Sequence, residues 1–120
     1  MAWQSQRSKH RERHHPEVDV EQLDRAQSSA AVVIDVRESG EYVAGHVPGA
    51  ALMPMSQLGS RLDELDKTRP VYVICASGNR SAAMTDLLVA TGYDAYSVTG
   101  GTTAWVRSGR PLETGATTAR

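Results

Sequence analysis

The sequence predicts an α/β domain with a mostly parallel sheet and helices on both faces. Apolar segments typical of buried strands alternate along the chain with segments of helical periodicity, which is the pattern of βαβ units. Two continuous apolar runs, at residues 31–36 and 71–74, have the composition of central strands buried on both faces. With 120 residues, the chain is long enough for one domain with its own core.

The expected elements follow in chain order. Strands are expected at residues 18–20, 31–36, 51–53, 71–74 and 94–98. Helices are expected at residues 21–26, 38–43, 58–65 and 82–90, with a last one after Gly101. Asp19 or its neighbour is placed to cap the first helix, and Gly45 to end the second. The third is predicted from leucines at 58, 62 and 65 and is broken at residues 68–70.

Both ends of the chain lack this periodicity, so the domain is expected to span residues 17–112. Residues 1–16 are predicted to be a mobile basic tail, because residues 7–15 are polar and carry a net charge of +3. The histidines at 10, 14 and 15 lie there, where solvated side chains are favoured over a metal site. Residues 113–120 are predicted to be a second tail.

Composition excludes several classes of function. The formal net charge of −1 argues against nucleic-acid binding by the chain as a whole. No apolar run approaches the roughly 18 residues of a membrane span, and the N-terminus lacks the apolar core of a signal peptide. A single cysteine excludes an internal disulfide, an all-cysteine metal site and a resolving thiol in the same chain. We therefore expect a cytoplasmic protein without a cofactor, a metal ion or membrane contact.

The only cysteine follows a predicted buried strand directly and precedes a predicted helix. The segment between them reads Cys75, Ala76, Ser77, Gly78, Asn79, Arg80 and Ser81. Gly78 permits a positive φ, so the loop can curl and turn backbone N–H groups inward. Together with the N-terminal end of the following helix, these groups form an anion pocket and favour the thiolate of Cys75. The sequence therefore predicts a reactive thiol at the carboxyl edge of the sheet, where α/β folds place their sites.

The other loop residues are given supporting roles. Arg80 is expected both to clamp the loop, through Asp35 or Glu41, and to recognise an anion. The hydroxyls of Ser77 and Ser81 are expected to be available to a bound anion, although Ser81 is slightly favoured to bond its own helix turn. Gly78 and Asn79 are interpreted as residues that shape the backbone.

Five groups of residues occur in one order between Val18 and Pro111. They are Ile34 to Arg37, Glu41-Tyr42, Gly45 to Ala50, Val71 to Cys75 with Gly78 to Ser81, and Gly100-Gly101 with Trp105. On these motifs the chain resembles the rhodanese-like sulfurtransferases in their single-domain form. The resemblance implies a five-stranded parallel sheet flanked by helices. It also implies that Cys75 cycles between thiol and persulfide, moving sulfane sulfur from a donor such as thiosulfate or a persulfide to a thiophilic acceptor.

The same resemblance places further residues beside the thiol. Asp35, Arg37 and Glu41 are expected to support the site, more as a buried ion-pair network that positions loops than as participants in the chemistry. His46 is expected to be a structural hydrogen-bonding residue and Trp105 a core residue. Ala76 carries no charge where thiosulfate-specialised members often have a charged residue, so weak use of thiosulfate and a preference for a persulfide donor are expected.

Two other functions remain open at this stage. Phosphatases and arsenate reductases share the Cys-loop-Arg arrangement, but their loops carry one more residue than the six from Cys75 to Arg80. A non-catalytic or regulatory binding module is the second alternative. The partners expected are a small-molecule sulfur donor and acceptor, with a protein persulfide as a further candidate, and the chain is expected to be a monomer or weak dimer.

Overall fold

The computed structural model of the protein describes residues 16–116, so the predictions for residues 1–15, including their three histidines, lie outside the described residues. Five strands form a single sheet in the order β1-β5-β4-β2-β3, and every neighbouring pair is parallel. The strands are β1 (Glu17–Val18), β2 (Val32–Asp35), β3 (Ala51–Leu52), β4 (Val71–Ile74) and β5 (Ala95–Val98). The predicted α/β class with a five-stranded parallel sheet is confirmed.

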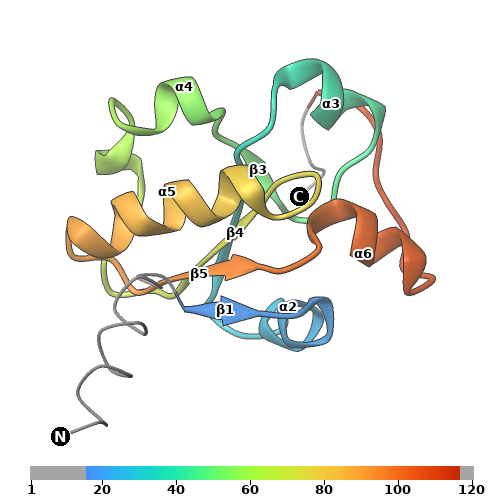
Figure 1. Cartoon of the computed structure of the whole chain (residues 1–120), viewed down its shortest axis with the longest axis horizontal. Coiled ribbons are helices and arrows are strands. Elements are labelled where there is room, and N and C mark those ends of the chain that lie inside the picture. Colours follow the sequence, from blue (N-terminus) through green and yellow to red (C-terminus); the bar gives the residue numbers. More distant parts are fainter. Residues whose placement is uncertain (1–15, 117–120) are drawn as a thin grey trace, which may run out of the picture.

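Helices cover both faces of the sheet (Figure 1). They are α2 (Val20–Ala26), α3 (Ser39–Ala44), α4 (Met55–Leu58), the 3₁₀ turn η1 (Leu62–Glu64), α5 (Asn79–Ala90) and α6 (Gly101–Arg107). On one face Leu58 of α4 and Leu88 of α5 pack with Val73 of β4. On the other face Trp105 of α6 packs with Ile74, the next residue of the same strand. Successive residues of β4 thus enter two separate apolar clusters, which explains why this strand is apolar throughout.

The start of α2 shows how local chemistry sets a boundary. The Asp19 carboxylate accepts from the Gln22 N–H at 2.9 Å, and the Gln22 side chain accepts from the Asp19 N–H at 2.9 Å. This reciprocal capping box stabilises the first turn. The predicted cap at Asp19 is therefore confirmed, and the helix takes Val20, which the sequence assigned to the edge strand.

The single helix predicted through leucines 58, 62 and 65 is wrong. Helix α4 ends at Leu58, and only one 3₁₀ turn follows, from Leu62 to Glu64. The break falls at Gly59 and Ser60, residue types that favour helix less than the leucines beside them. All three leucines still pack on the same apolar cluster. Their spacing therefore shows that they face the same cluster. A short helix followed by a separate turn can place them there as well as one continuous helix.

The prediction of a loose tail from residue 113 is wrong for the part that the structure describes. The backbone of Glu113 exchanges two hydrogen bonds of 2.8 Å with the backbone of His46 in an antiparallel bridge. The Gly115 N–H then donates to the Val43 carbonyl at 3.0 Å. These bonds use only backbone groups, so no periodicity of side chains in the sequence predicts them. The segment from Glu113 to Gly115 instead fastens the loop between α3 and β3.

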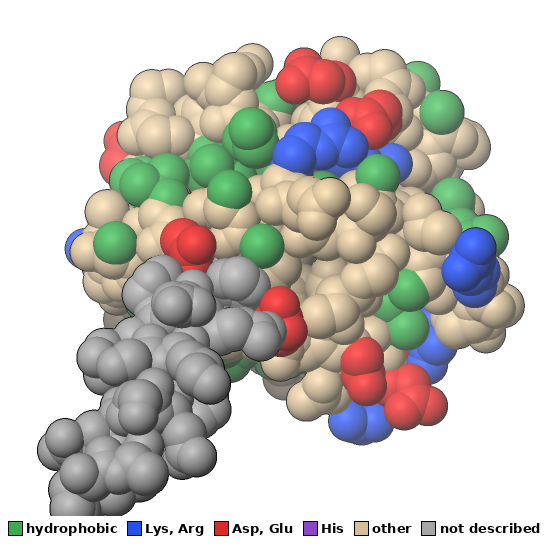
Figure 2. Space-filling model, viewed as in Figure 1, with side chains coloured by type: hydrophobic (Ala, Val, Ile, Leu, Met, Phe, Trp, Pro, Cys, Tyr) green, Lys and Arg blue, Asp and Glu red, His purple; other side chains and the backbone are tan. Residues whose placement is uncertain are grey.

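The face drawn in Figure 2 carries acidic and basic side chains next to one another, and its described part shows no broad area of a single charge. Apolar side chains gather over α4 and α5, at the upper left of the same view. Among residues 16–116, no helix has the length and apolar composition needed to cross a membrane.

Candidate active site

Cys75 lies at the carboxyl end of β4, the strand in the middle of the sheet, and its side chain is almost fully buried, with 1% of the residue exposed. The loop after it turns through Gly78, whose φ of +114° lies in the left-handed region that favours glycine. This turn brings the Gly78 N–H to 3.0 Å and the Ser81 N–H to 3.3 Å from the Cys75 sulfur. The predicted inward-facing N–H groups are thus present, and they surround the thiol.

Opposing effects set the pKa of the Cys75 thiol. Burial raises it, because a thiolate loses hydration inside the protein. The Ser81 hydroxyl and the N–H groups of Ser81, Gly78 and Ser77 outweigh burial, and together they hold the pKa below its ordinary value. The thiolate, which is the nucleophilic form of cysteine, is therefore favoured.

A second buried hydroxyl lies behind the loop. Ser81 Oγ lies 3.5 Å from the Cys75 sulfur, 3.1 Å from the Gly78 carbonyl oxygen and 2.9 Å from Ser97 Oγ of β5. Both serines are buried. The hydrogen bond to its own helix turn predicted for Ser81 is present, and it coexists with the contact to sulfur. Ser97 was missed by sequence reasoning, although a serine within the otherwise apolar β5 was a usable signal.

Helix α6 holds the first part of the loop from the other side. The Thr102 N–H and hydroxyl donate to the Cys75 carbonyl at 2.9 and 3.0 Å, and the Thr103 N–H donates to the Ala76 carbonyl at 3.0 Å. A Cβ at Gly101 would clash with the Cys75 carbonyl oxygen and come within 2.7 Å of the Ala76 carbonyl oxygen. Glycine at 101 therefore permits α6 to approach this closely. The two carbonyl groups are satisfied by α6 while the N–H groups further along face the sulfur.

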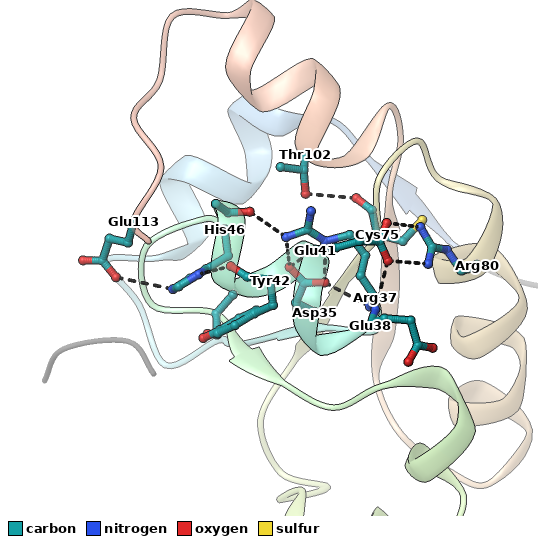
Figure 3. Close-up of polar contacts among 12 residues, drawn as sticks. Asp35, Arg37, Glu38, Glu41, Tyr42, His46, Cys75, Arg80, Thr102 and Glu113 are labelled. Atoms are coloured by element: carbon teal, nitrogen blue, oxygen red, sulfur yellow. Dashed lines mark hydrogen bonds and ion pairs between the residues drawn. The ribbon is translucent and has the colours of Figure 1, made fainter. Parts of the chain in front are cut away.

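Arg80 joins the loop to α3 (Figure 3). Its two terminal nitrogens donate to the two carboxylate oxygens of Glu41 at 2.8 and 2.9 Å, so of the two expected partners the structure selects Glu41. The hydrogen bond from Arg80, and then that from the Glu38 N–H, lower the pKa of Glu41 to about 2. The charge of Arg80 is therefore largely matched within the protein.

Asp35 and Arg37 form a separate, buried ion pair. The Arg37 Nη2 lies 2.8 Å from Asp35 Oδ2 and also donates to the Gly45 carbonyl at 2.8 Å. His46 is fully buried and stacks on Tyr42, with ring centroids 3.7 Å apart. These contacts tie the end of β2 to the loop between α3 and β3, which gives both Arg37 and His46 a structural task.

The remaining loop residues face outward. Ser77 and Asn79 are exposed, and Ala76 lines a pocket of about 390 Å³ beside the loop. Trp105 is buried, and its indole N–H donates to the Pro111 carbonyl at 2.7 Å. Within residues 16–116 there is no group of three or more His, Cys, Asp or Glu side chains arranged to hold a metal ion.

Comparison with known proteins identifies the architecture. The profile described as Rhodanese-like domain matches residues 19–108, which is most of the chain. The chain belongs to the rhodanese-like domain family. The match covers every strand except β1 as well as the whole Cys75 loop, so the resemblance inferred from the motifs is confirmed.

Solved structures of the family extend the similarity to three dimensions. A rhodanese-related protein from Thermoplasma volcanium has a TM-score of 0.78 at 31% identity, over 82% of this chain and 98% of its own. A rhodanese-like domain protein from Staphylococcus aureus has a TM-score of 0.75 at 34% identity, over 82% and 97%. A thiosulfate sulfurtransferase from Pseudomonas aeruginosa reaches 0.81 at 31% identity, over 89% of this chain but 22% of that protein. This rhodanese-like domain is thus related to a sulfurtransferase and resembles single-domain relatives over nearly their full length.

Proposed function

We propose that this rhodanese-like domain is a sulfurtransferase that carries sulfane sulfur on Cys75 as a persulfide. The observation that carries the proposal is the Cys75 sulfur itself, which receives N–H groups of Gly78 and Ser81 at 3.0 and 3.3 Å and whose pKa is lowered. A cysteine whose pKa is lowered in this way attacks sulfur as its thiolate, so the reaction needs no general base. The similarity to a thiosulfate sulfurtransferase supports the same reaction.

The reaction divides into two balanced steps. In the first, the Cys75 thiolate attacks the outer sulfur of thiosulfate, the S–S bond breaks, and its electron pair leaves with sulfite. Cys75 is left as the persulfide anion. In the second, a thiophilic acceptor such as cyanide attacks the outer sulfur of the persulfide, thiocyanate leaves, and the thiolate returns. Neither step requires an oxidant, a reductant or a metal ion.

The loop supports sulfur rather than phosphate as the transferred group. Only six residues run from Cys75 to Arg80, and the N–H groups of Gly78 and Ser81 converge on the sulfur of Cys75 itself. The Arg80 guanidinium, which would bind a phosphate oxygen, is engaged by both oxygens of Glu41. The same pairing leaves the loop with little free positive charge for thiosulfate. We therefore expect slow turnover of thiosulfate, with a persulfide as the better donor.

The test is the intact mass of the protein after incubation with thiosulfate, or with a low-molecular-weight persulfide, followed by desalting. The wild-type protein should gain one sulfur atom, and cyanide should remove it with release of thiocyanate. Cys75→Ser should gain nothing while keeping the circular-dichroism spectrum and melting temperature of a folded domain. A wild-type protein that never gains sulfur from either donor would overturn the proposal.

A further inference from the structure

A pocket lies beside the Cys75 loop, and the sulfur-transfer steps proposed above assign no ligand to it. It measures about 390 Å³ and is lined by Arg37, Ala76, Thr102, Thr103, Val106 and Arg107. Ala76 is the residue next to the thiol, so the pocket borders the loop at the start of its curl. On the α6 side, Thr102 and Val106 are four residues apart, as are Thr103 and Arg107, which places each pair on one side of the helix.

Among residues 16–116, no acidic side chain pairs with Arg107, the second arginine of this pocket. Arg37 lies in the same pocket but is buried and paired with Asp35 at 2.8 Å. Arg80, on the loop itself, is paired with Glu41. Arg107 is exposed and forms no ion pair within residues 16–116. An anion that enters the pocket therefore meets the positive charge of Arg107 at the C-terminal end of α6.

The pocket suits a molecule larger than thiosulfate. Pockets that bind organic ligands typically measure about 300–1,000 Å³, and this one falls in that range. Ala76 and Val106 give it an apolar part, and Val106 is 48% exposed although it is a large aliphatic residue. A lining that combines apolar side chains with a guanidinium fits a short carbon chain that ends in a carboxylate.

We infer that Arg107 selects carboxylate-bearing thiols and persulfides as the sulfur donor or acceptor of Cys75. The carboxylate pairs with Arg107, the carbon chain lies on Val106 and Ala76, and the sulfur reaches the loop. With a persulfide donor, the Cys75 thiolate attacks the outer sulfur, the S–S bond breaks, and the electron pair leaves with the donor as its thiolate. The inference rests on the proposed function, because it names the class of molecule that exchanges sulfur at the same cysteine.

A first experiment tests the pocket without requiring sulfur transfer. Cys75 is the only cysteine of the chain, so any thiol–disulfide exchange reports on it alone. We compare the second-order rates of the anionic reagent 5,5′-dithiobis(2-nitrobenzoate) and the uncharged 4,4′-dithiodipyridine. The rate with the anionic reagent, divided by the rate with the uncharged one, should fall about threefold or more in Arg107→Gln. Added salt should reduce the same ratio in the wild-type protein.

The matched control is Lys67→Gln, which removes the same charge at the opposite edge of the sheet. Lys67 precedes β4, and its ammonium group lies 5.2 Å from the centre of the Tyr93 ring, so it is remote from the loop that follows the same strand. The rate ratio should equal that of the wild-type protein in this variant. An equal fall in both variants, or an unchanged ratio in Arg107→Gln, would overturn the inference.

A second experiment measures the transfer step itself. The persulfide of Cys75 is discharged by 3-mercaptopropionate, which carries a carboxylate, or by 2-mercaptoethanol, which is uncharged. Arg107→Gln should slow the first acceptor relative to the second, and Lys67→Gln should not. If no persulfide forms but the ratio of rates with the two disulfide reagents depends on Arg107, the proposed function fails and the recognition of anions in the pocket stands. If a persulfide forms and neither ratio depends on Arg107, the present inference alone fails.

Discussion

At the scale of residues, the Cys75 sulfur lies in a position with almost no exposure to solvent, so its thiolate form would be a buried charge. Burial of an isolated anion is unfavourable, so the thiolate depends on the hydrogen bonds that it receives. The N–H groups of Gly78 and Ser81 lie within 3.3 Å of it. Hydrogen bonds to a charged group contribute about 1.5–3 kcal/mol each, so two or three of them work against the cost of burying the thiolate. In the reaction that we propose, the same N–H groups would also stabilise the persulfide anion.

Ser97 Oγ lies 2.9 Å from Ser81 Oγ, in a pair in which either hydroxyl can donate. The Ser81 hydroxyl donates to the Gly78 carbonyl and lies next to Ser97 Oγ, and it accepts from the Cys75 thiol. When Cys75 is a thiolate, the sulfur becomes a further acceptor for the Ser81 proton. Ser97 Oγ has no other hydrogen-bonding partner among the described residues, so the arrangement that satisfies it has Ser97 donating to Ser81. The Ser81 proton is then directed to the sulfur or to Gly78, and its bond is strengthened by the one it accepts.

We therefore predict that Ser97→Ala raises the pKa of Cys75. The Ser81 hydrogen bond lowers the pKa of Cys75, so weakening a bond of about 1 kcal/mol to the thiolate should move the pKa upward. The measurement is the rate of alkylation by iodoacetamide as a function of pH, which follows the thiolate fraction. Thr85→Val is the control, because Thr85 is also buried and its hydroxyl has no hydrogen-bonding partner among residues 16–116. Superimposable pH profiles for Ser97→Ala and the wild-type protein would contradict this role.

At the scale of elements, the pair of Arg80 and Glu41 connects two helices that do not follow each other in the chain. Arg80 lies in the first turn of α5 and Glu41 in the first turn of α3. Glu41 also accepts from the Glu38 N–H at 3.0 Å, so its carboxylate closes the start of α3 as well. Protonation of Glu41 would weaken both interactions at once.

The sign of the resulting pH dependence follows from the lowered pKa of Glu41. The folded value of about 2 lies below the unfolded one, so the pair stabilises the protein above about pH 4.5 and this contribution is lost as the pH falls toward 2. Because 38% of the Glu41 side chain is exposed, solvent screening limits the effect to about 0.2–1 kcal/mol.

Glu41→Gln should accordingly be less stable than the wild-type protein at pH 7. The difference between their free energies of unfolding should be smaller at pH 3. Urea unfolding at the two pH values gives both free energies of unfolding. Glu21→Gln, which removes an exposed carboxylate of α2, is the comparison for a general loss of charge. A gap that stays constant between pH 7 and pH 3 would show that the carboxylate charge of Glu41 is not what stabilises the loop.

At the scale of the whole molecule, the site depends on strands that are distant in sequence. The strand β4 lies between β2 and β5, so the ends of these three strands bring Asp35, Cys75 and the Gly100-Gly101 turn to one edge of the sheet. The last described segment closes this arrangement, because Glu113 bonds the backbone of His46 and Gly115 bonds that of Val43. The loop between α3 and β3 is therefore held by Arg37 on one side and by the end of the chain on the other.

A protein truncated after Leu112 should be less stable than one truncated after Ala116. The longer protein keeps the three backbone hydrogen bonds of Glu113 and Gly115, and the shorter one loses them. We expect a difference of about 1.5–4.5 kcal/mol, since each of the three bonds contributes about 0.5–1.5 kcal/mol net. For a domain of this size, each kcal/mol corresponds to about 4–8 °C in melting temperature. Equal melting temperatures would show that residues 113–116 do not stabilise the domain.

The amino-acid sequence alone determined the fold class, the approximate position of every strand, and the Cys75 loop with its inward N–H groups. These features are local: apolar runs mark strands, and a glycine in a short loop sets its curl. The failure at leucines 58, 62 and 65 has the same origin, because apolar spacing records which residues face the core and not whether the backbone between them is helical.

Only the tertiary structure decided which groups pair across the site. The choice of Glu41 over Asp35 for Arg80, the contact of Ser97 with Ser81, and the return of Glu113 to His46 each join residues separated by 16 to 67 positions. Such pairs depend on strand order and on the distances between elements, which no local pattern encodes. Backbone bonds are the extreme case, because every residue except proline offers the same donor and acceptor and leaves no trace in side-chain composition.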